Sequence, residues 1–203
     1  MDADLQTVKA EGKDDKVKAL IEAAGQRAIQ FRRQGFHCSE ASFMAINETL
    51  KIMDPAMVRI VTGFHGGGGS HRLIPSIDLK GVLEELASGR DKRDPEEAGV
   101  AITGHLCGPL ASGVICIGYL YGRRSPDDPL CCVDELAFEL HRRYLEKLQA
   151  KECKALRDIW VPLSDNHTCE YVYKTGSELA VELLLEAHTL VPECKQKIFP
   201  ENL

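Results

Sequence analysis

Residues 98–122 read AGVAITGHLCGPLASGVICIGYLYG, and no side chain in this stretch is charged. A run of this length could cross a membrane as a helix. However, its six glycines, its proline and its polar residues lower its mean hydropathy. We therefore predict a central uncharged helix over 96–122, buried in a protein core rather than inserted in a membrane. Pro109 cannot donate a backbone hydrogen bond, so this helix should kink beside Cys107.

The composition is that of one globular domain. The chain has 203 residues, of which 44% are hydrophobic and 28% charged, and its net charge is -6. The excess of acidic over basic residues gives no electrostatic reason to expect a nucleic-acid partner. The first residues, MDADLQTVKAEGKDDKVK, lack the apolar segment of a secretory signal, so we expect a cytoplasmic protein.

Helical periodicity on both sides of the central segment predicts an all-α, single-domain helical bundle. The polar residues 1–13 are expected to form a disordered or frayed N-terminus, residues 14–190 a cysteine-rich helical domain and residues 191–203 a C-terminal tail. Further helices are predicted over 14–34, from Cys38 to Leu50, from Pro55 to Val61, and over 130–150, 153–159 and 168–190.

A glycine-rich loop separates the first helices from the central one. Residues 63–71 read GFHGGGGSH, and consecutive glycines cannot form a regular element at low cost in entropy. A polar connector follows over 72–95, in which a short helix over 81–87 is expected. No stretch alternates between apolar and polar residues, so we predict no strand.

The chain contains eight cysteines, and without an export signal structural disulfides are not expected. Metal ligation or thiol chemistry is the favoured explanation for several of them. Cys38 and Cys169 begin predicted helices, where the helix dipole lowers a thiol pKa, although each could equally be a small buried side chain. Cys116 is expected in the core.

The remaining cysteines differ in their surroundings. Around Cys107, the kink and the flanking Gly104 and Gly108 leave room for a bulky group to approach the sulfur, although the small residues could instead serve a close helix crossing. Cys131 and Cys132 are adjacent, so at most one should face a shared site. Cys194, in the tail, is expected to have no role.

Familiar metal and nucleotide motifs are missing from the sequence. There is no CxxC pair, no CxxCH haem attachment motif and no HExxH, and no lysine follows the glycine run as in a phosphate-binding loop. Several histidines neighbour the candidate cysteines or the glycine loop. They could orient the ligands of a metal site by hydrogen bonds without binding the metal themselves: His37, His65, His71, His105 and His167.

Taken together, the segments GFHCSEA, TGFHGGGGS, CGPLASG with CIGYLYGR, ECKALR and TCEYV resemble the redox-active family named for its C_GCAxxG_C_C arrangement of cysteines. The resemblance extends over roughly residues 20–190, and it departs from the family pattern at Pro109, which replaces an alanine. By local motif, it assigns the four signature cysteines to Cys38, Cys107, Cys153 and Cys169.

The resemblance implies a helical redox protein of anaerobic microbes, related to the iron–sulfur domain of the dimeric split-Soret cytochromes. We therefore expect Cys38, Cys107, Cys153 and Cys169 to bind a [2Fe–2S] or [4Fe–4S] cluster in an electron carrier without a substrate of its own. The backbone of the glycine loop, together with Gly108, is expected to approach the cluster; the loop residues are Gly66, Gly67, Gly68 and Gly69.

Two alternatives remain open from the residues. The first is a metal-free thiol–disulfide oxidoreductase that uses Cys38 and Cys169, and the second is a structural zinc protein. A homodimer and a redox partner protein are expected, with no nucleic acid and no membrane as partner.

Overall fold

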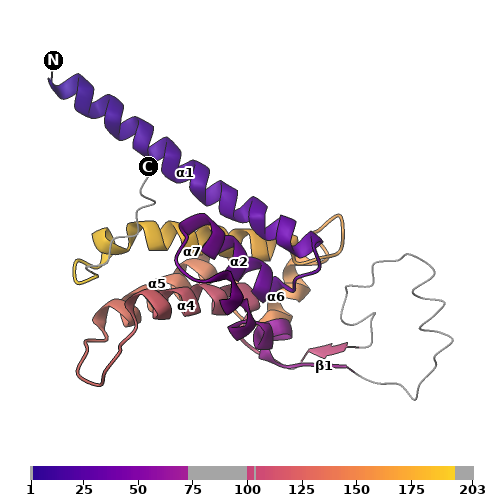
Figure 1. Ribbon diagram of the computed structural model, residues 1–203. Helices are drawn as coiled ribbons and strands as arrows, with labels where there is room; N and C mark the ends of the chain where they lie inside the picture. The colour runs from indigo at the N-terminus through magenta and orange to yellow at the C-terminus, as the bar shows by residue number, and fades with distance from the viewer. Residues whose placement is uncertain (1, 73–99, 103, 195–203) are drawn as a thin grey trace.

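The computed structural model describes residues 2–72, 100–102 and 104–194, with side-chain detail for 14–69 and 104–194. Within these residues the chain is a helical bundle, which confirms the predicted all-α class (Figure 1). Two short 3-10 helices, η1 (Pro55–Ile60) and η2 (Thr62–Gly68), follow α2. The α-helices are α1 (Asp2–Arg33), α2 (Cys38–Leu50), α4 (Gly108–Tyr121), α5 (Cys131–Leu148), α6 (Cys153–Trp160) and α7 (Glu170–Leu190).

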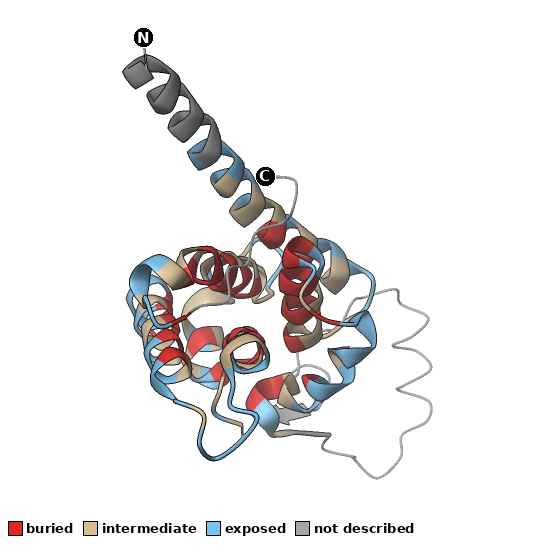
Figure 2. Ribbon diagram, turned by 60° about the vertical axis from the view of Figure 1, so that its left-hand side comes forward, coloured by how far each residue is buried: buried red, intermediate tan, exposed pale blue. Residues whose placement is uncertain are grey.

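The core lies between α2, α4, α5 and α7, and α1 packs along α2 and α7. Figure 2 shows the buried residues on the faces that these helices turn toward one another. On α5 the buried residues recur every four positions, as the sequence pattern predicts. The largest fully buried side chains include Phe43, Ile46, Leu110, Ile117, Leu136, Leu140, Tyr144, Leu148, Leu183 and Leu184.

The first helix is longer than predicted, because α1 begins at Asp2 rather than at residue 14. The prediction of a disordered or frayed end over residues 1–13 rested on the lack of an apolar stripe there. Most of these residues are nevertheless good helix formers, such as alanine, leucine, lysine and glutamate, which explains why the helical backbone can begin this early.

The predicted helix over 96–122 is wrong at the described residues 100–102 and 104–107, because 100–102 form a strand and α4 begins only at Gly108. Pro109 occupies the first turn, where its missing N–H is one of those that have no partner in any helix. The proline therefore starts the helix instead of kinking it. No described helix combines the length and apolar character needed to cross a bilayer.

Two short strands were not predicted. β1 (Ser70–Arg72) and β2 (Val100–Ile102) pair antiparallel, with His71 opposite Ala101. Three residues are too few to produce a recognisable alternation, which explains why the sequence pattern missed them. The connector over 72–95 and its expected helix over 81–87 lie, apart from Arg72, outside the described residues.

Candidate functional site

The four signature cysteines all lie where a helix begins. Cys38 is the first residue of α2 and Cys153 the first of α6, while Cys107 and Cys169 are the capping residues of α4 and α7. The first backbone N–H groups of a helix have no partner within it, and the helix dipole places partial positive charge there. Each of the four sulfurs is therefore attached to a helix end that favours negative charge.

Backbone pairing brings Cys107 next to Cys153. The N–H of Cys107 donates to the carbonyl of Lys151 at 2.9 Å, and the N–H of Cys153 donates to the carbonyl of His105 at 2.8 Å. An isolated antiparallel bridge between Leu106 and Glu152 lies between these two bonds. The start of α4 and the start of α6 are thus held together by main-chain hydrogen bonds, whatever their side chains.

A close helix contact brings Cys38 to the same place. A Cβ atom on Gly108 would lie 2.9 Å from Cβ of Ser39 and 3.2 Å from Sγ of Cys38, so only glycine allows α4 to approach α2 this closely. The hydroxyl of Ser112 donates to the carbonyl of Ser39 at 2.7 Å, and is also within 3.0 Å of the Gly108 carbonyl. The structure therefore places Gly108 at a close helix contact beside Cys38, and its expected approach to a cluster stays a prediction.

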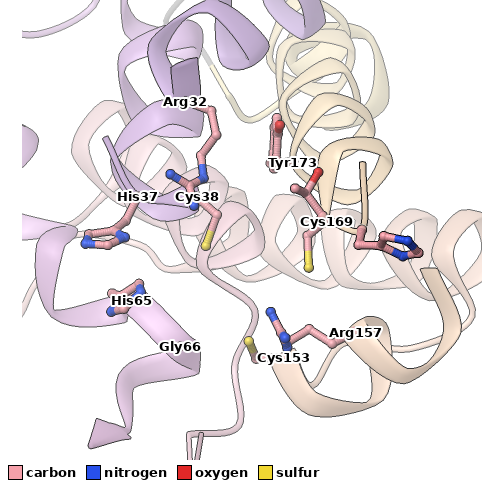
Figure 3. A pocket seen from close by; sticks show the side chains of 11 residues that line it. Arg32, His37, Cys38, His65, Gly66, Cys153, Arg157, Cys169 and Tyr173 are labelled. Atoms are coloured by element: carbon pink, nitrogen blue, oxygen red, sulfur yellow. The ribbon is translucent and has the colours of Figure 1, made fainter. Parts of the chain in front are cut away.

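Three of the four sulfurs face a shared cavity. Cys38, Cys153 and Cys169 line a hollow of about 60 Å³, several times the ~10–15 Å³ that one water requires. Figure 3 shows their sulfurs turned toward the same space from three different helices. Cys107 is buried beside them and is not in the cavity wall; its Sγ lies 3.2 Å from the hydroxyl of Tyr144, which donates to it.

Two arginines that no motif in the sequence indicated line the same cavity. Arg32 extends from the end of α1 and Arg157 from α6 (Figure 3). Arg157 follows Cys153 by four residues and Tyr173 follows Cys169 by four, so each pair shares one helix face. This spacing could have indicated Arg157 and Tyr173 from the sequence, but not Arg32. The arginines add positive charge around the thiols.

Three of the five candidate histidines also line the cavity: His37, His65 and His167. The rings of His37 and His65 stack with centroids 3.7 Å apart (Figure 3). Burial, together with the nearby Arg32 charge, lowers the pKa of His37, and burial lowers the pKa of His65 to about 4. Both rings are therefore neutral at neutral pH. His105 contributes its carbonyl rather than its exposed ring, and the side chain of His71 is outside the described part.

Burial changes the ionisation of the signature thiols in the direction opposite to that predicted. Desolvation raises the pKa of Cys153 and of Cys169 to about 12. Burial also raises the pKa of Cys38, although the Arg32 charge and backbone N–H groups oppose it. The pKa of Cys107 is raised well above its ordinary value by burial and by the neighbouring thiols. The expectation of low-pKa thiols at Cys38 and Cys169 is wrong, because desolvation raises their pKa by more than the helix N-termini lower it.

The glycine loop contacts the site at its first two glycines. Gly66 lines the cavity, and Gly67, with φ of +75°, packs so closely that a Cβ would lie 2.8 Å from Cβ of Cys153. Gly68 and Gly69 are not part of the cavity wall. The loop therefore closes one side of the cavity and supports α6.

The donor set is compatible with an iron–sulfur cluster. Cysteine thiolates are the usual ligands of such clusters. The hydroxyl of Ser39, next to Cys38, is fully buried and has no hydrogen-bond partner in the described part of the chain, so it has a donor available for a sulfur. Among the described residues, no three histidine, cysteine or acidic side chains are grouped closely enough to hold one metal ion.

The other four cysteines lie apart from this site. Cys116 is fully buried in the core, as predicted, and Cys131 is an exposed free thiol. Cys132 and Cys194 form a disulfide, with their Cα atoms 5.3 Å apart. The chain thus contains a disulfide although no structural disulfide was expected, and Cys194, for which no role was expected, is bonded to Cys132 and only 2% exposed.

Residues 94–183 match the model of a family described as "Putative redox-active protein (C_GCAxxG_C_C)". The match confirms the recognised family over this segment, which contains Cys107, Cys153 and Cys169. It is shorter than the resemblance over 20–190, and Cys38 and the glycine loop lie outside it. No curated protein and no solved structure matches the chain. The comparison supports a cysteine-rich, redox-active protein.

Proposed function

We propose that the protein is an electron carrier whose four signature thiolates, from Cys38, Cys107, Cys153 and Cys169, bind one iron–sulfur cluster. The observation that carries the proposal is the convergence of helix N-termini with their cysteines: Cys38, Cys153 and Cys169 line one small cavity, and Cys107 is buried beside it. Such a cluster would supply one-electron transfer when bound.

The surroundings of the cavity suit an anionic group. Four thiolates outweigh the net positive charge of the iron–sulfide core that they would bind, so the bound cluster would be anionic. The helix ends, together with Arg32 and Arg157, would balance part of this negative charge. Positive charge and hydrogen-bond donors near the sulfurs stabilise the more negative, reduced state. We therefore expect these groups to raise the reduction potential.

The spacing of the donors supports a cluster over a single zinc ion. A tetrahedral zinc site gathers four ligands around one atom. In the described part of the chain no three possible ligands are grouped in that way, and three of the four thiols line a cavity instead. A cluster distributes its thiolates over several irons, so its ligands can stand farther apart.

Thiol–disulfide exchange at the signature cysteines is the weaker candidate. Exchange needs a thiolate, and thiols whose pKa is about 12, such as Cys153 and Cys169, are almost entirely protonated at neutral pH. A metal removes this difficulty, because a coordinating thiol is deprotonated outright.

The test is anaerobic reconstitution with iron and sulfide, followed by metal and sulfide analysis, a visible spectrum and electron paramagnetic resonance, which distinguishes the cluster types. Cys107→Ser should lose most of the bound iron and colour. Cys116→Ser is the matched control, because Cys116 is equally buried but lies in the core away from the cavity. It should keep both.

Two results would contradict the proposal. The first is a colourless wild-type protein without iron after reconstitution, and the second is a Cys107→Ser variant that binds as much iron as the wild type. Stoichiometric zinc without a redox transition would instead support the structural zinc protein. A homodimer, a cytoplasmic location and a redox partner protein remain proposals, of which the first is checked by light scattering.

A further inference from the structure

A second group of cysteines lies at the other end of the bundle. Cys131, Cys132 and Cys194 line a cavity of about 410 Å³ together with Tyr121, Gly122, Asp128, Pro129 and Glu193. Tyr121 is the last residue of α4, whereas Cys107 caps its first turn. With 14 residues, α4 separates the two places by about 20 Å. This cavity is therefore independent of the proposed cluster site.

The disulfide between Cys132 and Cys194 is shielded on most sides but opens into this cavity. Cys132 is 9% exposed and Cys194 2%, and both contribute to the cavity wall. The hollow is large enough to admit the thiol-bearing end of another molecule. A disulfide that joins a chain end to a helix start and borders a cavity can be attacked without unfolding of the core.

The position of Cys132 favours its release as a thiolate. It is the second residue of α5, where backbone N–H groups lack helical partners and the dipole stabilises negative charge. The carboxylates of Asp128 and Glu193 oppose this effect. Both carboxylates line the cavity; Glu193 is exposed, and the charge of Asp128 is partly satisfied by hydrogen bonds that it accepts from the N–H groups of Arg124 and Ser125.

We propose that Cys132 and Cys194 form a thiol–disulfide exchange site that accepts two electrons from a dithiol. One thiolate of the dithiol attacks Sγ of Cys194, which breaks the bond to Cys132, forms a mixed disulfide and releases Cys132 to take up a proton. The second thiol of the dithiol then attacks its own sulfur in the mixed disulfide, which breaks the bond to Sγ of Cys194. The dithiol is released as a cyclic disulfide, and Cys194 takes up a proton.

The net change is one disulfide reduced in the protein and one formed in the dithiol, with two protons and two electrons transferred. In the reduced state, the bond that holds residues 191–194 to α5 is absent. In a reducing compartment, disulfides of this kind are usually catalytic or redox-sensing rather than structural.

The experiment equilibrates the native full chain with dithiothreitol at a series of reduced-to-oxidised ratios, quenches with an alkylating reagent and maps the labels by mass spectrometry. We expect Cys132 and Cys194 to change together from unlabelled to labelled in a single two-electron transition. The exposed thiol of Cys131 is the internal control and should be labelled at every ratio.

Two variants separate this site from the proposed cluster. Cys132→Ser should leave Cys194 labelled at every ratio, and Cys107→Ser should leave the transition where it is in the wild type. The proposal is overturned if Cys132 and Cys194 are labelled at every ratio, or if both stay protected in fully reduced dithiothreitol. Since these outcomes are read from the wild-type chain, they do not depend on whether a variant folds or a cluster binds.

Discussion

Cys107 combines a local role at the start of α4 with contacts to residues far away in the sequence. It caps α4, its N–H donates to the carbonyl of Lys151, and its sulfur receives a hydrogen bond from Tyr144. Tyr144 is fully buried on α5, so its hydroxyl is held in place by the core. A donor fixed in this way stabilises negative charge on the sulfur without any rearrangement.

Replacing Tyr144 with phenylalanine tests that donor. In the reconstituted protein, Tyr144→Phe should lower the reduction potential, because a hydrogen bond to a ligating sulfur favours the reduced state. A potentiometric titration measures the shift. Tyr119→Phe, on an exposed side chain, is the control and should leave the potential unchanged. An unchanged potential in Tyr144→Phe would show that the hydroxyl does not act on the cluster.

Gly67 allows a second residue-scale test, which does not require a cluster. Its φ of +75° disfavours any side chain, and an added Cβ would lie 2.8 Å from Cβ of Cys153 and 2.9 Å from the carbonyl carbon of Gly104. We expect Gly67→Ala to lower the free energy of unfolding by about 2 kcal/mol or more.

Gly63→Ala is the control in the same loop, since an added Cβ there meets nothing within 4 Å. It should change stability by less than about 0.5 kcal/mol. Urea unfolding of both variants measures the difference. Equal stabilities would mean that the loop does not pack against α6 as described.

At the scale of elements, α4 shows that glycines in one helix can have opposite roles. Gly113 lies where α4 crosses α5 and α7, and a Cβ there would lie 2.7 Å from Cδ2 of Leu140 and 3.2 Å from Cβ of Ala180. An added Cβ at Gly118 meets nothing within 4 Å. The sequence presents the two glycines alike, and only the packing distinguishes them.

The two glycines should respond differently to alanine. At Gly113 the overlap costs about 1–3 kcal/mol, which exceeds the gain of about 1 kcal/mol in helix propensity, so Gly113→Ala is expected to destabilise the protein. At Gly118 the gain is unopposed, so the variant should be more stable by up to about 1 kcal/mol. Thermal or urea unfolding of the two variants measures these opposite changes. A Gly113→Ala variant that is more stable than the wild type would show that α4 does not pack closely against α5 and α7 at this residue.

At the scale of the whole molecule, burial of the signature thiols couples folding to pH. In the metal-free protein the pKa of Cys153 and Cys169 is about 12, above the ordinary value of 9.0 that they regain on unfolding. Their contribution to stability is fully present below pH 9 and is lost as the pH rises toward 12. The loss is about 1.4 kcal/mol per pH unit for each thiol.

Urea unfolding of the reduced, metal-free protein at about pH 8 and about pH 10 measures this loss. A variant with both Cys153→Ser and Cys169→Ser should lose less stability over the same interval. Equal losses in the variant and the wild type would show that other groups cause the pH dependence.

Much of the helical framework was readable from the sequence because it depends on neighbours a few residues apart. The stripe of α5, the start of α2 at Cys38 and the core position of Cys116 follow from periodicity and residue type. The start of α4 could also have been predicted, had Pro109 been read as a first-turn residue. The short strands could not, since their pairing is long-range.

Residue order alone was therefore enough to predict most of the helices, the cysteine-rich character and the position of Cys38, Cys153 and Cys169 at helix starts, but not that of Cys107, which was expected inside a longer helix. That Cys38, Cys153 and Cys169 line one cavity, with Cys107 beside it, became visible only in the packed fold. The packing also decided that their thiols are protonated when metal-free, and that Cys132 pairs with Cys194. Helix formation depends on residues a few positions apart, whereas the convergence of the cysteines and the desolvation of their thiols depend on which distant segments pack against each other.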